Sequence, residues 1–300
     1  MSDAEVFARE RGRLLGLAYR MVGRLVDAED LVQEAWLRWS NVATNEVVSP
    51  RAYLTQVVTR LCLDHLSSAP VRREQTVGVD LPEPLDEAGT VALDDLAAAS
   101  ESLTVAFLVM LQKLSPPERA VYLLREVFEH DYDEVARVTG KSSSACRQIV
   151  RRAKEHLGRS RRRFPAEHDD AVVLVARFAE ATRRGDVVAL LELLAPDVTL
   201  YAASPDAPTY GRARATARPI AGRDAVVQFL LAIQGQAPDD VVTRVATTNG
   251  RPSLLTYVDG ELIAVISYDL ADAETLRIDA LFVQADPTRL QGLGPLRFLS

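Results

Sequence analysis

The side chains whose types and spacing could do chemistry lie between residues 142 and 163. The outer face of a predicted helix there carries Ser144, Arg147, Gln148 and Arg151. The opposite face is apolar, with Ala145, Ile149, Ala153 and Leu157 at steps of four. Arginine can grip O6 and N7 of guanine, and glutamine can grip N6 and N7 of adenine. The stretch also holds eight Arg or Lys residues against one acid, Glu155, a balance that suits DNA phosphates. These features predict a surface that reads base pairs.

Local signals upstream predict the elements that hold this surface. Ser115 is a good N-cap for a helix whose first turn contains Pro116, Pro117 and Glu118. A short helix over Tyr132 to Val138 follows, and Gly140 ends it because glycine accepts a positive φ. Three serines then offer the N-cap of the next helix. The order predicts a helix-turn-helix, and a solvated helix hairpin in an all-α protein is the alternative.

Length and composition bound the rest of the chain. Its 300 residues suggest two or three domains, and 48% hydrophobic residues are enough to build cores. No run of 18 apolar residues and no apolar N-terminal segment occur, so we expect neither a membrane span nor a signal peptide. Cys62 and Cys146 lack metal-ligand or CxxC spacing, which favours small buried side chains in a reducing cytoplasm. His65 has no second ligand spaced to help it, and we expect no metal and no cofactor.

Charge is distributed unevenly around a net value of −7. Residues 1–73 carry +1, residues 74–112 carry −8, residues 113–165 carry +6 and residues 166–300 carry −6. A basic segment is therefore flanked by an acidic linker and an acidic C-terminal half, as suits a DNA-binding protein with an internal counterweight.

The N-terminal part predicts three helices, over residues 4–25, from Asp27 to Ser40, and from Pro50, which follows the N-cap Ser49. In the second helix the apolar residues Leu31, Ala35 and Trp39 share a face. In the third helix the core stripe is Leu54, Val57, Val58, Leu61 and either His65 or Leu66, and the outward residues are Gln56, Thr59, Arg60 and Asp64.

These segments together resemble an extracytoplasmic-function (ECF) sigma factor of the sigma-70 family of bacterial RNA polymerase. The resemblance rests on DAEDLVQEAWLRW, on SPRAYLTQVVTRLCLDHL and on the helix-turn-helix, in that order. It implies that the first two segments form region 2, which binds the clamp helices of the largest polymerase subunit and opens the −10 element. It also implies that the helix-turn-helix forms region 4, which reads the −35 element and touches the β flap.

The same resemblance implies roles for individual residues. It implies that Asp30, Gln33 and Glu34 contact the polymerase. It also implies that Thr59, Arg60 and Asp64 line the pocket for single-stranded −10 DNA. The −35 element is read by Ser143, Ser144, Arg147, Gln148 and Arg151. Arg152 and Arg159–Arg163 are better suited to phosphate contact.

The remaining chain predicts an acidic linker over 73–102 and an α+β domain over 169–290, followed by a tail over 291–300. Helices over 172–184, 187–194 and 222–233 precede strand-like runs that predict a curved antiparallel sheet, with Asp259-Gly260 as a hairpin turn. This part resembles the SnoaL-like, nuclear-transport-factor-two superfamily, and the whole chain resembles the SigJ-type sigma factors with such a fused domain.

Two short stretches support that subgroup. The linker tetrapeptide Leu81-Pro82-Glu83-Pro84 matches its LPEP, and Asp286-Pro287-Thr288-Arg289-Leu290 resembles its NPDKL. Two departures are a missing tryptophan before LPEP, where Asp80 stands, and a loop over 202–213 without the glycine-rich DGGGK.

An enzyme reading of the C-terminal domain has little support. Residues 169–300 contain no histidine, and Asp279, the best candidate for an inward acid, alternates with apolar neighbours and is more readily an outward strand residue. We therefore predict no enzyme but a cytoplasmic sigma factor with region 2 over 1–72 and region 4 over 103–165. Its C-terminal domain is expected to regulate it by an intramolecular contact, without a separate anti-sigma protein or a membrane. The alternatives are a DNA-binding repressor or ligand sensor fused to a SnoaL-like enzyme or ligand-binding domain, and a pure interaction protein.

Overall fold

The described residues are 2–42, 47–68, 80–86, 100–157, 168–203, 218–270 and 276–294 in the computed structural model of the chain. They fall into two units. The first unit combines Met1–Glu74, Ala88–Leu103 and Phe107–Arg161, and the second combines Gln75–Glu87, Thr104–Ala106 and Arg162–Ser300. The second unit therefore takes in part of the acidic linker as well as the C-terminal half of the chain.

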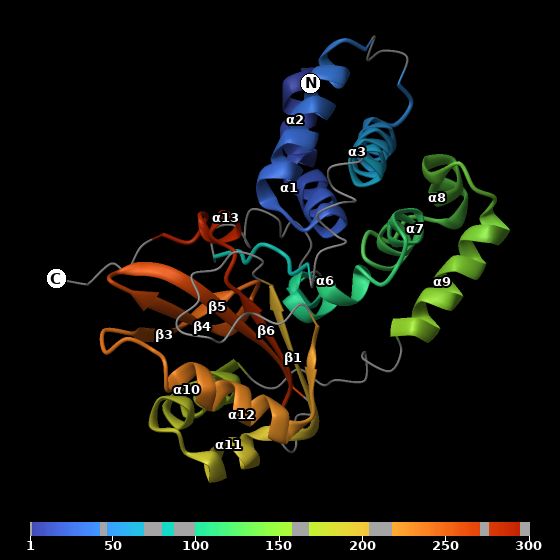
Figure 1. The fold of residues 1–300 in the computed structure, drawn as a ribbon. Helices are drawn as coiled ribbons and strands as arrows, with labels where there is room; N and C mark the ends of the chain where they lie inside the picture. The colour runs from blue at the N-terminus through green and yellow to red at the C-terminus, as the bar shows by residue number, and fades with distance from the viewer. Residues whose placement is uncertain are drawn as a thin grey trace. The chain divides into compact units, whose positions relative to one another are not determined.

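The first unit is helical (Figure 1). Its N-terminal helices are α1 (Asp3–Val22), α2 (Leu25–Ser40) and α3 (Pro50–Ser67). A 3₁₀ turn (Ser100–Leu103) precedes the others, which are α6 (Val105–Leu111, in this unit from Phe107 onward), α7 (Pro116–Glu126), α8 (Tyr132–Thr139) and α9 (Ser143–Leu157). The expected helices are confirmed, because capping side chains close in sequence define where they begin and end. Their ends differ from the expected ones by a few residues.

Those caps are visible at several helix ends. Ser2 and Glu5 form a capping box on α1, and Gly23 ends that helix in the left-handed region with φ 79°. The Ser49 hydroxyl accepts the Ala52 N–H at 3.3 Å, directly before the N1 proline of α3. At α7 the Glu118 carboxylate accepts the Ser115 N–H at 3.2 Å and the Ser115 hydroxyl at 2.7 Å. These polar side chains satisfy N–H groups that have no partner inside the helix.

Helix α3 corrects one expectation, since it is buried on two sides. Besides the predicted stripe, in which Leu66 is buried and His65 half-buried, three further side chains are fully buried: Thr55, Thr59 and Cys62. Thr59 was expected to face outward, yet its side chain has no exposed surface. The reason is that α3 packs not only on α1 and α2 but also on α7 and α8 of the same unit.

The second unit is α+β. It contains α10 (His168–Arg184), α11 (Val187–Leu193), β1 (Leu194–Ala203), β2 (Ile220–Ala221), α12 (Arg223–Gln234), β3 (Val242–Thr248), β4 (Arg251–Val258), β5 (Glu261–Leu270), β6 (Ile278–Gln284) and α13 (Pro287–Leu290). The strands form one sheet in the order β2-β1-β6-β5-β4-β3. The expected antiparallel pairing is confirmed for β3, β4, β5 and β6, but β1 pairs in parallel with β6, Leu200 opposite Leu281. That pairing joins segments about eighty residues apart, which no local pattern specifies.

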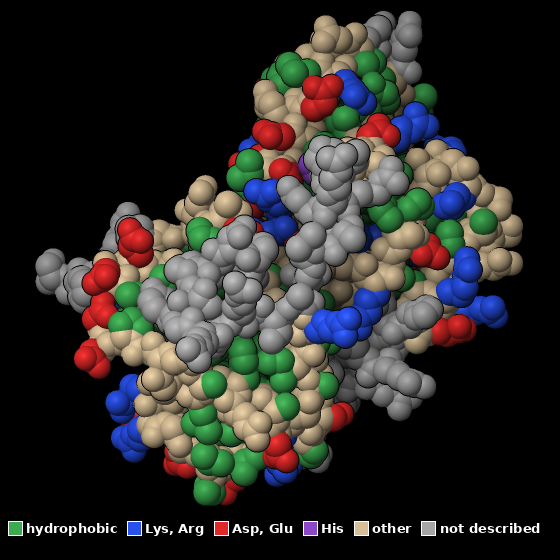
Figure 2. Space-filling view, viewed as in Figure 1, with side chains coloured by type: hydrophobic (Ala, Val, Ile, Leu, Met, Phe, Trp, Pro, Cys, Tyr) green, Lys and Arg blue, Asp and Glu red, His purple; other side chains and the backbone are tan. Residues whose placement is uncertain are grey.

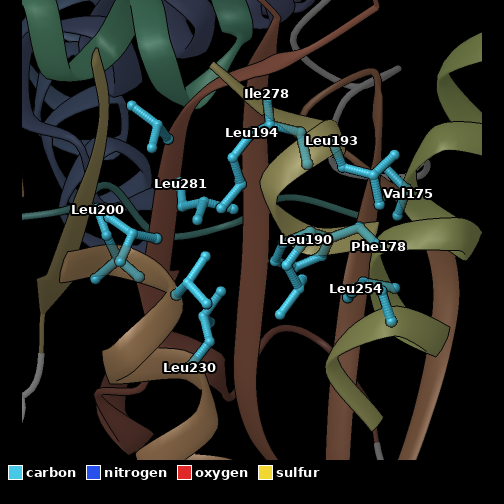
Figure 3. Close-up of a cluster of buried hydrophobic side chains, with 14 of the residues drawn as sticks. Val175, Phe178, Leu190, Leu193, Leu194, Leu200, Leu230, Leu254, Ile278 and Leu281 are labelled. Carbon is cyan, nitrogen blue, oxygen red and sulfur yellow. The ribbon is translucent and has the colours of Figure 1, made fainter. Parts of the chain in front are cut away.

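Side chains from the two faces of the sheet build two cores. The larger core lies between the sheet and helices α10, α11 and α12, and Figure 3 shows Phe178, Leu200, Leu230 and Leu281 converging there. The smaller core lies on the other face, where α13 and the turn after it contribute Leu290 and Leu293. The alternation along β4 explains the division: Leu254 belongs to the larger core, and its neighbour Leu255 to the smaller one.

Candidate nucleic-acid interface

The helix-turn-helix is held by short-range hydrogen bonds at its turn. Asp131 caps α8 by accepting the N–H groups of Asp133 and Glu134 at 2.9 and 2.8 Å. Gly140 takes the left-handed conformation with φ 67° and ends the helix, as predicted. The first turn of α9 is then joined to α8, because the Ser143 hydroxyl donates to Asp133 Oδ1 at 2.5 Å.

The outer face of α9 carries the predicted DNA-reading residues. Ser144, Arg147, Gln148, Arg151 and Arg152 are exposed, and Ser143 is half-buried. The buried face consists of Cys146, Ile149, Val150 and Ala153. Ala145 was expected in that face but is half-buried, because the helix is rotated so that Cys146 fills the inner position. The side chain of Leu157 and residues 159–163 lie outside the described residues.

Tyr132, at the start of α8, contacts two arginines of the neighbouring helices. The Arg125 guanidinium lies 4.8 Å from the ring centroid and the Arg147 guanidinium lies 5.1 Å from it. An open hollow of about 410 Å³ adjoins the ring and is lined by Tyr132, Arg147, Val150, Arg151, Lys154 and Glu155. Figure 2 shows Lys and Arg side chains gathered over α9. The surface is cationic and can approach a polyanion.

Carboxylates orient two other cations of α9. Lys154 Nζ lies 2.6 Å from Glu126 Oε2, and Arg151 Nε lies 3.7 Å from Glu155 Oε1. Arg151 and Glu155 are both largely exposed, so their pair contributes little to stability.

The polymerase-contact residues implied by the resemblance lie on α2. Asp30 and Gln33 are exposed, and Glu34 is half-buried and pairs with Arg38 at 3.2 Å. The opposite face of α2 is buried through Val32, Ala35 and Trp39. A hydrophilic strip is therefore available on the outside of α2.

The three residues implied for the −10 pocket are not equally accessible. Arg60 and Asp64 are exposed on α3. Thr59 instead donates its hydroxyl to the Thr55 carbonyl at 2.7 Å within the core. In this conformation only Arg60 and Asp64 of the three could meet a nucleotide.

Sequence reasoning missed three buried arginines of the first unit. Arg20 donates to the Ser102 hydroxyl at 3.0 and 2.9 Å, Arg13 to the Thr55 hydroxyl at 2.9 Å, and Arg119 to the backbone carbonyl oxygens of Leu111 and Met21. The bonds from Arg20 to Ser102 and from Arg119 to Met21 join α1 to the segment that carries the helix-turn-helix, whereas the bond from Arg13 joins α1 to α3. Arginine is strongly hydrophilic and its partners are far away in sequence, so no periodicity signals such a role.

His130 lies close to the same junction. Its Nδ1 is 3.1 Å from Glu134 Oε2, whereas Nε2 is buried without a hydrogen-bond partner. Burial lowers the pKa of His130, and the positive charges of Arg13 and Arg51 act in the same direction, partly offset by Glu134. The neutral imidazole is the favoured form at this position.

The linker tetrapeptide and the C-terminal motif meet in the second unit. Leu81, Pro82, Glu83, Pro84 and Leu85 are all buried. Gln284 Nε2 donates to the carbonyl oxygens of Leu81 and Pro82 at 2.9 and 3.3 Å. Leu85 exchanges two hydrogen bonds with Asn249: its N–H donates to Oδ1 at 3.0 Å, and its carbonyl accepts the Asn249 N–H at 2.9 Å.

Arg289 adds a charged anchor to this contact. It donates to the Leu81 carbonyl at 2.8 Å and pairs with Asp80 at 2.5 Å. Asp80, the departure from tryptophan, thus has a partner in Arg289 of the C-terminal motif. Asp286 and Pro287 begin α13, with Asp286 accepting the Thr288 N–H at 2.9 Å, and Leu290 is buried. We call residues 80–86 the linker strap.

Neither Gln284 nor Asn249 was singled out from the sequence. Gln284 is 3% exposed and Asn249 is 1% exposed, both unusually buried for amides. Asn249 also has a positive φ of 52° in the β3–β4 turn, and an Asn-Gly pair there was the available signal. The predicted loop over 202–213 lies outside the described residues from residue 204 onward.

The described residues contain no group of three or more His, Cys, Asp or Glu side chains that could hold a metal ion. None of the described helices has both the length and the apolar run that crossing a bilayer requires. Asp279, the acid that the sequence suggested for an inward position, is half-buried on β6 and is not without an interaction partner.

Comparison with protein families identifies both helical segments. Residues 6–70 match the family described as Sigma-70 region 2, and residues 104–157 match Sigma-70, region 4. These ranges contain all the residues to which the resemblance gives polymerase-binding, −10 or −35 roles, apart from Arg159–Arg163.

Individual relatives match almost the entire chain. The ECF RNA polymerase sigma factor SigJ of Mycobacterium tuberculosis is 40% identical over 98% of this chain and 95% of its own length. The probable ECF RNA polymerase sigma factor SigI of the same organism is 32% identical over 94% and 93%. The crystal structure of M. tuberculosis SigJ superposes with a TM-score of 0.72, covering 97% of this chain and 99% of that chain at 30% identity.

Proposed function

The chain belongs to the ECF sigma factors of the sigma-70 family, and from this premise we propose which of its surfaces carry out the family's work and how the C-terminal domain regulates it. The family is not enzymatic, and its members direct RNA polymerase to promoters. The open questions are therefore the individual contacts and the role of the second unit.

The contact surfaces follow from exposure and charge. The exposed face of α9 suits the −35 element, with Arg147 and Arg151 matched to guanine, Gln148 matched to adenine and Arg152 to phosphate. The exposed residues Arg60 and Asp64 suit the −10 strand. Asp30, Gln33 and Glu34 on α2 suit the clamp helices of the polymerase.

We infer that the second unit modulates transcription in cis by holding the linker strap. The observation that carries this proposal is the set of hydrogen bonds that join Gln284, Arg289 and Asn249 to the strap. The strap lies in the linker between the two sigma regions, so immobilising it shortens the chain length that can separate them. Because the domain is covalently attached, its effective concentration at the strap is high without a separate anti-sigma protein.

A variant that weakens the strap contact tests this role. We would compare the full-length protein with the double variant Gln284→Met/Arg289→Met in promoter-dependent transcription with core polymerase. The matched control is Gln228→Met/Arg177→Met, because both of these residues are exposed in the same unit. The expected result is an altered transcript yield for the strap variant alone. Equal yields from all three proteins would show that the strap contact does not regulate transcription.

A further inference from the structure

Arg147 differs from Arg151 and Lys154 on α9 in what orients it. Lys154 and Arg151 each pair with a carboxylate, Glu126 and Glu155 respectively. Among the described residues no carboxylate forms an ion pair with Arg147, and its guanidinium lies over the Tyr132 ring. The two kinds of partner have different chemical consequences.

A carboxylate consumes the N–H donors of a guanidinium, whereas an aromatic ring does not. The ring attracts the cation through the negative potential of its π face and leaves the N–H groups at the edge of the guanidinium free. Guanine is read by two such donors directed at O6 and N7. A ring contact therefore fixes the position of Arg147 and keeps its hydrogen-bonding capacity available.

The ring is itself held in place from the other side of the motif. Arg125 of α7 donates to the His130 carbonyl at 3.0 Å, and its guanidinium also lies over the Tyr132 ring. A chain of contacts thus runs from α7 through Tyr132 of α8 to Arg147 of α9. Arg125 and Tyr132 are half-buried, while Arg147 is exposed.

Arg147 needs such a support because it has room to move. The hollow of about 410 Å³ beside the ring is open, and an exposed arginine has many rotamers to lose when it binds. A side chain that already populates the binding conformation loses less entropy on meeting the base.

We propose that Tyr132 is a positioning residue for −35 recognition, which selects the orientation in which Arg147 reads its base pair. The inference rests on the proposed −35 role of Arg147. It assigns to the first helix of the motif a part in sequence discrimination rather than in folding alone.

The test is a double-mutant cycle on the full-length protein bound to core polymerase. The probe is a labelled duplex selected by the wild-type holoenzyme from a library with a randomised −35 element. Its single-base variants at every −35 position serve as competitors. The proteins are Tyr132→Leu, Tyr132→Phe, Arg147→Ala and Tyr132→Leu/Arg147→Ala, and the readout is the affinity ratio between the selected duplex and each variant.

We expect Arg147→Ala to lose discrimination at one position. Tyr132→Leu should reduce discrimination at that same position about two- to fivefold, the equilibrium effect of an exposed cation–π contact. Tyr132→Phe should retain it, because the ring remains. In the Arg147→Ala background, Tyr132→Leu should have no further effect on discrimination.

The opposing outcomes are distinct. If Tyr132→Leu keeps full discrimination while Arg147→Ala loses it, Arg147 reads DNA without the ring, and the inference is wrong although the proposed function stands. If Tyr132→Leu lowers discrimination equally in the wild-type and Arg147→Ala backgrounds, Tyr132 has only a structural role and the inference is wrong. If Arg147→Ala changes discrimination nowhere, the assignment of Arg147 to the −35 element fails, and the inference fails with it.

Discussion

Replacing Gln284 by methionine should release the linker strap without unfolding the second unit. Methionine has a similar length but no N–H donors, so the volume at this 3% exposed site is nearly conserved. The Pro82 carbonyl loses the Gln284 donor at 3.3 Å, and the Leu81 carbonyl keeps only the bond from Arg289 among those described above. Leaving a buried acceptor unsatisfied costs about 1–3 kcal/mol, which favours strap detachment by about 5- to 160-fold.

The amide hydrogen of Leu85 reports this detachment directly. It donates to Asn249 Oδ1 at 3.0 Å and is exposed to solvent exchange only when the strap leaves. Two other strap residues, Pro82 and Pro84, have no amide hydrogen, so the Leu85 signal is easy to isolate. We expect its exchange to accelerate by the factor given above in Gln284→Met.

Two controls decide the interpretation. Gln228→Met on the exposed side of α12 should leave Leu85 exchange unchanged. Amides of β4 in the larger core, such as that of Leu254, should keep their protection in Gln284→Met if detachment is local. Unchanged Leu85 protection in Gln284→Met would refute the claim that the glutamine holds the strap. A parallel loss of protection at Leu254 would show that the unit unfolds globally.

Three further predictions concern the first unit. Burial lowers the pKa of His130 below its ordinary 6.5, so the unfolded chain takes up the additional proton first as the pH falls. The free energy of unfolding should therefore be at its full value above about pH 6.5 and decrease progressively below it. His130→Gln should flatten this pH dependence in denaturant titrations, and an equal pH dependence for both proteins would contradict the prediction. Burial raises the pKa of the Cys62 thiol to about 12, so iodoacetamide should modify this residue only after unfolding, and rapid native labelling of it would contradict the structure. Gly140→Ala should destabilise the helix-turn-helix by about 1–2 kcal/mol through its φ of 67° alone, since no atom lies within 4 Å of the added Cβ; the midpoint of urea unfolding measures this, and an unchanged midpoint would argue against the left-handed turn.

The sequence by itself determined the elements that depend on neighbouring residues. Ser49 with Pro50, Ser115 with Pro116, and Gly140 mark helix ends because a cap, a preset φ or a left-handed residue acts within one turn. The outer face of α9 followed from its period for the same reason. Asp259 and Gly260 have the positive φ values, 50° and 77°, expected of a hairpin turn. Most of the α9 surface could therefore be predicted residue by residue.

Tertiary structure alone decided which of these elements meet. The burial of Thr59 depends on helices packed on a second side of α3, and the parallel pairing of β1 with β6 depends on a crossover. The strap contact joins Leu81 to Gln284, 203 residues apart. Hydrogen bonds and packing act over a few ångströms in space, whereas sequence patterns report only neighbours along the chain. The linker tetrapeptide and the C-terminal motif could be noticed separately, but only the folded domain shows that one holds the other.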